Sequence, residues 1–109
     1  MESLGIARQI TDRTQEILCL SHLGWLYVGL KQPLEALEHL QPALDLAERI
    51  GSCTEQSRLL AGLAEAHRLS GNSEQAIAYA RRALDLAQAN GRTYDREHAR
   101  KILNDLGVS

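Results

Sequence analysis

Apolar and polar residues follow one another along this chain with the three- and four-residue spacing of amphipathic helices, and the same arrangement occurs twice. The second set lies a constant 40 residues after the first, as from Ala36 to Ala76. The matched pairs are Leu23 and Leu63, Gly24 and Ala64, Tyr27 and His67, Ala36 and Ala76, and Ala43 and Ala83. Self-similarity at a period of roughly 20–50 residues is typical of stacked structural repeats.

Each repeated unit is predicted to contain two helices joined by a short turn. The many Leu and Ala residues, the absence of Phe and the presence of only 2 Pro favour helix throughout. The predicted helices cover residues 15–29, 33–50, 52–70 and 72–90. Gly24 and Ala36 then lie opposite each other when the two helices fold back antiparallel, and such small side chains let the backbones approach closely. The pattern therefore predicts an all-α fold of antiparallel helix pairs.

Capping patterns place two of the helix starts. We expect a loop over Thr11–Thr14, because Asp12-x-x-Gln15 can form a reciprocal capping box for the helix that follows. Ser52-x-x-Glu55 has the same form at the start of the third predicted helix.

The two prolines have different meanings. Pro33 suits the first turn of a helix, where its missing N–H costs nothing. Pro42 lies inside the same predicted helix, where proline costs about 3 kcal/mol, so we expect a kink or break between Glu38 and Pro42. Arg82 occupies the equivalent position of the second unit, which indicates that this position faces outward.

The chain is predicted to be a single domain, 1–109, whose parts are the end of a preceding repeat (1–10), two repeats (12–50 and 52–90) and the start of another (92–109). Two registers fit the last part. An offset of 40 places Leu103 over Leu63, whereas an offset of 43 places Gly107 over Ala64 at a close-packing position. We prefer the second register, which requires three extra residues in the loop after Gly91 and ends the chain within a helix. On this interpretation the chain is a piece of a longer protein.

Composition narrows the range of functions. A net charge of -2 gives no electrostatic reason to expect binding to nucleic acid or to an anionic membrane surface. No apolar stretch reaches the ~20 residues of a membrane span, and the first residues lack the pattern of a secretory signal. The 2 cysteines are too few for a disulfide framework or a zinc site, so we expect both to be reduced in the cytoplasm.

Candidate chemistry is sparse. No two of the 4 histidines stand at the helical metal spacing, so we expect no metal site, and His67 is predicted to pack at the core while the others face solvent. Cys19, in an apolar helix, is predicted to be an inert core residue, and Cys53 to lie in a loop. We find no phosphate-binding loop and no arrangement for a nucleophile, and therefore predict no enzyme activity and no cofactor.

The repeated motif resembles the tetratricopeptide repeat (TPR), whose pattern is W-x₂-L-G-x₂-Y, then A-x₃-F, then P. The first unit matches at Leu23, Gly24, Tyr27 and Ala36. Leucine replaces the family tryptophan, Leu40 replaces the phenylalanine, and no proline closes the unit. The period of 40 exceeds the usual 34 and is similar to that of the longer repeats of bacterial signalling and regulatory proteins. The resemblance implies a right-handed superhelical stack of antiparallel helix pairs, an α-solenoid.

The resemblance also implies a surface and a role. The first helix of each TPR pair lines a concave face, which implies a non-catalytic module that binds a peptide or helix of a protein partner, or a neighbouring domain of the same chain. Trp25 either contacts such a partner or packs against the next helix, and the charged residues either bind or are solvated. A structural spacer or oligomerisation segment with an empty groove is the alternative, and a small-ligand sensor is a third class. The residues implied to line the face are Ser21, Trp25, Val28, Arg58, Ala61, Glu65, Arg68, Lys101 and Asn104.

The two ends are a second candidate interaction surface. Ile102, Leu103 and Leu106 are expected to lack a following helix, and Leu4 and Ile6 to lack part of their cover. Exposed apolar patches drive association, so we expect a homodimer through these ends.

Overall fold

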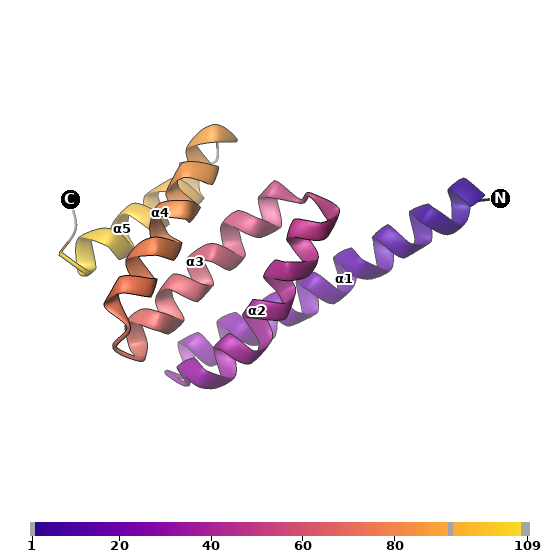
Figure 1. The fold of residues 1–109 in the computed structure, drawn as a ribbon. Helices are drawn as coiled ribbons and strands as arrows, with labels where there is room; N and C mark the ends of the chain where they lie inside the picture. The colour runs from indigo at the N-terminus through magenta and orange to yellow at the C-terminus, as the bar shows by residue number, and fades with distance from the viewer. Residues whose placement is uncertain (1, 92, 108–109) are drawn as a thin grey trace.

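The computed structural model describes the backbone of residues 2–91 and 93–107 and the side chains of residues 12–91 and 96–107. This described part forms the helices α1 (Glu2–Gly29), α2 (Pro33–Ile50), α3 (Cys53–Leu69), α4 (Ser73–Ala89) and α5 (Thr93–Asp105). Each helix contacts the next in sequence, and α3 also contacts both α1 and α5. Figure 1 shows the resulting stack, in which α2 and α4 lie in front of α1 and α5. The predicted all-α stack of helix pairs is confirmed.

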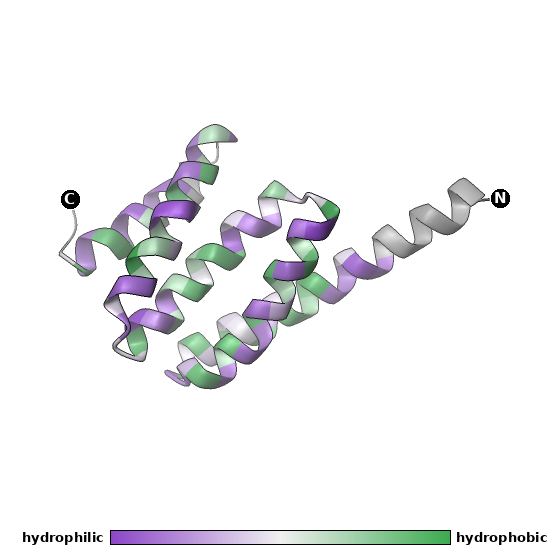
Figure 2. Cartoon of the chain, in the orientation of Figure 1, coloured by the Kyte–Doolittle hydropathy of each residue, from purple (hydrophilic) through white to green (hydrophobic). Residues whose placement is uncertain are grey.

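The hydrophobic core is centred on α3, which contacts each of the other four described helices. Leu59 and Leu63 of α3 and Ile17 of α1 are fully buried, and Leu44 of α2 is 2% exposed. Figure 2 shows hydrophobic and hydrophilic residues alternating along each of the described helices. Burying one such side chain contributes roughly 1.5–3 kcal/mol, so α3 supplies a large share of the stability.

A single leucine of α2 fills the space between two glycines. The side chain of Leu40 lies directly over Gly24 of α1, and its Cδ1 would lie 3.1 Å from a Cβ at Gly62 of α3. Gly24, Ala36, Ala64 and Ala76 are all buried, as expected of close-packing positions. The residue packed on Gly24 is Leu40, one helical turn after Ala36. Glycine at position 24 therefore makes room for a large side chain.

The turns after α1, α2 and α3 share one backbone geometry. At the end of α2, Gly51 N–H donates to Glu48 O (3.3 Å) and Ser52 N–H to Ala47 O (3.0 Å), with Gly51 in the left-handed region at φ 72°. This pair of bonds is the Schellman motif. After α1, the left-handed position is held by Lys31 at φ 59°, a conformation that glycine adopts more readily. The capping box expected at Ser52 is not formed, because Ser52 makes no side-chain cap hydrogen bond.

The loop expected at Thr11–Thr14 is absent, because α1 runs without interruption from Glu2 to Gly29. Thr11 stands 40 residues before Gly51, where a left-handed glycine ends α2. Threonine disfavours that conformation, and neither glycine nor proline occurs between residues 11 and 14 to stop the helix. The expected loop is therefore wrong.

Pro42 does not break its helix. α2 continues through it to Ile50, so the expected break is wrong. Pro42 is exposed, as is Arg82 at the equivalent position, which confirms that the position faces outward. A proline ring on the solvent side clashes only with its own helix, so the packing of α2 on α1 and α3 retains the helical backbone.

The last helix follows the register that we did not prefer. α5 begins at Thr93, 40 residues after the start of α3 at Cys53, so the loop has no three extra residues. α5 ends at Asp105, and Gly107 is exposed in a turn at φ 80° with nothing near it. Gly107 is therefore a turn residue, and its expected close-packing role is wrong.

A tyrosine and a histidine pack against each other between the two helices of each repeat. The tyrosine is on the first helix in one repeat and on the second helix in the other. Tyr27 and His39 have ring centroids 5.2 Å apart, and His67 and Tyr79, the equivalent positions, stack at 5.3 Å and 4°. His67 is buried, with 8% of its surface exposed, as predicted. His39 is partly exposed and donates from Nδ1 to the Glu35 carbonyl oxygen at 2.8 Å.

Two expectations about exposed and buried residues are also wrong. Cys19 is exposed on α1, as is Cys53 on α3. Ile102 and Leu103 are 1% and 7% exposed because α5 turns them onto α4 and α3, so they leave no apolar patch at that end. Leu106 is half-buried, and the side chains of Leu4 and Ile6 lie outside the described residues.

Candidate functional site

Trp25 is positioned at the meeting point of α1, α3 and α5. Its ring centroid lies 5.5 Å from that of His98 on α5, with the two planes tilted by 34°. The Trp25 ring also lies against Gly62 of α3, where a Cβ atom would come within 3.3 Å of Trp25 Cε2. Because Gly62 has no side chain, the Trp25 ring can pack directly on the α3 backbone and reach His98 on α5. Trp25 therefore connects three helices while remaining partly exposed.

Two polar atoms beside this ring have no hydrogen-bond partner within the described chain. Trp25 Nε1 and Ser21 Oγ, one turn earlier on α1, are both buried atoms of this kind. An indole N–H can only donate, so it requires an acceptor from elsewhere. Buried polar groups are normally satisfied, and each exception calls for an explanation.

A charged cluster lies further along α3. Arg68 Nη2 donates to Glu65 Oε2 at 2.7 Å, a short ion pair with side chains 35% and 14% exposed. The hydrogen bond that Arg68 donates to Glu65 raises the pKa of Arg68, and the negative charges of Glu65 and of Asp105 on α5 raise it further. Arg68 Nε is buried without a partner among the described groups. The guanidinium group is therefore fixed in place and has donor capacity left over.

The predicted surface residues fall into three groups. Trp25, Glu65 and Arg68 belong to the two features just described. Ser21 and Ala61 are buried, at 0% and 3% exposure, so neither presents a side chain at the surface. The others keep accessible side chains: Val28 and Arg58 are half-buried, and Lys101 and Asn104 of α5 are exposed.

Sequence reasoning missed His98, Gly62 and Asp105. The strict offset of 40 would have found two of them, because it aligns His98 with Arg58 and Asp105 with Glu65, both assigned to the face. The preferred offset of 43 aligns Lys101 instead of His98 with Arg58, so His98 was not assigned to the face. Nothing in the sequence marks Gly62, since its role depends on the ring that lies over it.

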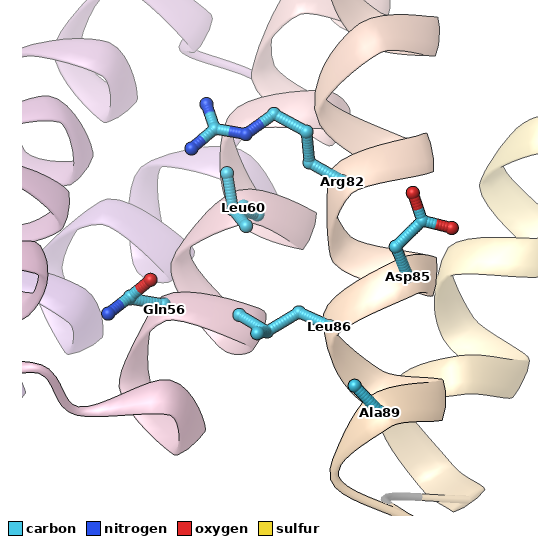
Figure 3. A pocket seen from close by; sticks show the side chains of 6 residues that line it. All are labelled: Gln56, Leu60, Arg82, Asp85, Leu86 and Ala89. Atoms are coloured by element: carbon cyan, nitrogen blue, oxygen red, sulfur yellow. The ribbon is translucent and has the colours of Figure 1, made fainter.

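A separate hollow of about 310 Å³ opens between α3 and α4. Figure 3 shows Gln56 and Leu60 of α3 on one side and α4 on the other, with the guanidinium group of Arg82 above Leu60. Arg82 already donates to Glu48 Oε1 at 3.3 Å and lies 5.9 Å from the Tyr79 ring centre. The hollow is wide open to solvent and holds few converging polar groups, which is unlike the enclosed pockets that bind small molecules.

Other kinds of site are not supported by the described residues. No group of three or more His, Cys, Asp or Glu side chains among them could hold a metal ion. None of the described helices combines the length and hydrophobicity that crossing a membrane requires.

Comparisons with known proteins give the family. A search of curated protein sequences gave no match. The chain is similar to the TPR domain of Arabidopsis FLU, whose crystal structure superposes with a TM-score of 0.70 at 20% identity and covers 86% of this chain and 93% of that one. The family model of the tetratricopeptide repeat matches residues 29–89, more than half of the chain. These repeats generally form non-catalytic modules that mediate protein–protein interactions. The chain belongs to the tetratricopeptide repeat family.

Proposed function

We propose that this chain is a non-catalytic interaction module of a larger regulatory or signalling protein in the cytoplasm. On this proposal it binds a peptide or helix of a protein partner, or a neighbouring domain of its own protein, on the face formed by α1, α3 and α5. Membership of the TPR family supports a protein partner. The charge of -2 and the absence of a basic patch in the sequence argue against nucleic acid.

The observation that carries the proposal is that Trp25 of α1 and Arg68 of α3 both remain partly exposed. Tryptophan and arginine are the residue types that contribute most to protein interfaces. The apolar groups of a partner would pack on the exposed part of the Trp25 ring, and a carboxylate of the partner would accept from the partly exposed Arg68 side chain. An incoming peptide thus contacts an aromatic ring and an arginine that the fold leaves partly exposed.

The experiment uses the fact that Trp25 is the only tryptophan. Peptides selected from a random library against the pure chain are titrated while Trp25 fluorescence is recorded, and binding is expected to change its intensity and wavelength. Arg68→Ala should weaken a selected peptide about tenfold or more, as expected for an interface arginine. Arg82→Ala is the matched control, because Arg82 is an ion-paired arginine of α4. Equal affinities for both variants would contradict the proposal.

The alternative is a structural spacer with nothing in the groove. The packing of Trp25 against Gly62 and His98 favours it, because a ring held by its own fold has less surface left for a partner. The two functions are separated by Arg68→Ala together with Trp25→Phe, which keeps an aromatic ring but removes the N–H. If the parent protein retains its regulation with both substitutions and full helix content, the spacer is correct.

A further inference from the structure

One face of α1 carries large apolar side chains that the described chain leaves exposed. Leu23 and Leu26 of α1, Leu30 directly after α1 and Leu34 at the start of α2 are 42%, 56%, 57% and 68% exposed, and we call them the leucine face. Among the described residues, these four leucines are the large hydrophobic residues with the most exposed side chains. Clustered apolar exposure of this kind marks an interaction site more often than scattered leucines do.

The next repeat shows what this face is built for. The residues 40 positions after Leu23 and Leu26 are Leu63 and Ala66, which are fully buried, whereas those after Leu30 and Leu34 are the exposed Ser70 and Glu74. Leu63 and Ala66 lie on α3, which is packed between α2 and α4, whereas α1 contacts only α2 and α3. The part of the leucine face formed by Leu23 and Leu26 is thus the equivalent of an interface that is already formed one repeat further on. Its natural cover is another apolar helix.

The other end of the molecule cannot supply that cover in a second copy. The outer residues of α5 include exposed Arg100, Lys101, Asn104 and Asp105. A head-to-tail stack would press these polar groups onto leucines and take charges out of water without partners. The same face on a second copy is the apolar surface that the described chain itself provides. The spacing of Leu23, Leu26 and Leu30 is that of a coiled-coil seam, which can pack against itself.

We propose that two copies of this chain associate through the leucine face, with their α1 helices antiparallel about a two-fold axis near Leu26. Leu26 then faces its counterpart, and Leu23 of each copy faces Leu30 of the other. Such an interface is isologous and closes at two subunits. The net charge of -2 opposes the contact only weakly. Because four leucines per copy cover less than the ~1,200 Å² of a standard interface, the affinity is expected to be micromolar or weaker.

The first test is the mass of the pure chain by sedimentation equilibrium over a wide concentration range. The expected result is a rise from the monomer mass of 12.1 kDa to twice that value. Leu26→Glu should abolish the rise with unchanged helix content, because residue 26 is already more than half exposed. Ala78→Glu is the matched control, since it places the same charge on an exposed position of α4, which does not contact α1. A wild-type chain that stays monomeric to about 1 mM overturns the proposal, as does a Leu26→Glu variant that still dimerises.

The second test fixes the arrangement by disulfide formation. Leu26→Cys, in a background of Cys19→Ser and Cys53→Ser, should give a covalent dimer on mild oxidation, because residue 26 lies near the axis. A variant that keeps Cys19 alone should not cross-link, since antiparallel packing separates the two Cys19 residues. Cross-linking through Cys19 but not through position 26 contradicts the antiparallel dimer.

A third test asks whether the leucine face binds a separate helix instead of a second copy of the chain. A synthetic peptide of residues 33–50, the α2 helix that packs on α3, is added to the labelled chain. If the chain alone is monomeric while the peptide binds and Leu26→Glu prevents it, the occupant is a helix of the α2 type and the dimer proposal is wrong. If the chain dimerises and excess peptide does not compete, the dimer is supported.

Discussion

The packing of Leu40 on Gly24 predicts a compensating pair of substitutions. In the first repeat a large residue meets a glycine, whereas the equivalent positions in the second repeat are Ala80 and Ala64. The space between the two helices is filled by one large side chain in the first repeat and by two small ones in the second. Changing Gly24→Ala and Leu40→Ala together rebuilds the second repeat's pair within the first.

The expected magnitudes follow from the contacts. A Cβ at Gly24 would overlap Cγ and Cδ2 of Leu40, so the whole leucine must move. Overpacking of this kind costs about 1–3 kcal/mol, and the better helix propensity of alanine returns up to about 1 kcal/mol, leaving a loss of about 1 kcal/mol. Leu40 is fully buried, so Leu40→Ala alone should cost about 3 kcal/mol.

In the double variant the overlap disappears, the propensity gain remains and the new methyl group partly fills the cavity. We expect a loss of about 2 kcal/mol instead of the additive value of about 4 kcal/mol. The assay is urea unfolding followed by helical circular dichroism, with each free energy extrapolated to water. As a control, Ala80→Leu should destabilise the second repeat, and adding Ala64→Gly should restore most of the loss. Strict additivity at positions 24 and 40 would show that the two residues do not contact each other.

Three further substitutions test local features of the fold by the same assay. Lys31→Gly should stabilise the protein by about 0.5–1 kcal/mol, because it removes a non-glycine residue from the left-handed region; a loss would refute the strain. Pro42→Arg, which copies Arg82, should gain about 2–3 kcal/mol by restoring a helical hydrogen bond, and no gain would mean that α2 has adapted to the proline. Burial lowers the pKa of His67 from 6.5, so the unfolded chain binds its proton more readily and stability should fall as the pH decreases below about 6.5. Replacing His67, which stacks on Tyr79, by tyrosine should flatten this dependence of stability on pH. An unchanged dependence would show that His67 is not its cause.

Much of the fold could be predicted because its signals are local. Pro33 marks the start of α2 and Gly51 its end, since a proline fits the first turn and a left-handed glycine closes a helix. The 40-residue repeat then placed Ala36 and Ala76 in the core. These predictions required only the conformational preferences of single residues and a count of positions.

The errors arose where a residue's state depends on what covers it. Cys19 lies in an apolar helix, and its exposure follows from the missing neighbour of α1, which no pattern within the helix reveals. The loop at Thr11–Thr14 is expected from the Asp12-x-x-Gln15 capping pattern, although no glycine stands there to end a helix as Gly51 ends α2. The contact of Trp25 with His98 depends on three helices at once and on the bare backbone of Gly62.

The most direct test of the docking surface is the indole N–H resonance of Trp25 in a two-dimensional ¹H–¹⁵N spectrum. It is the single indole signal of the chain and belongs to the unsatisfied donor on the face of α1, α3 and α5. When a selected peptide is titrated in, we predict that this resonance shifts in proportion to binding, because the peptide packs on the exposed part of the Trp25 ring and changes the surroundings of its N–H. A peptide that binds tightly while the indole signal stays in place would contradict the proposed face.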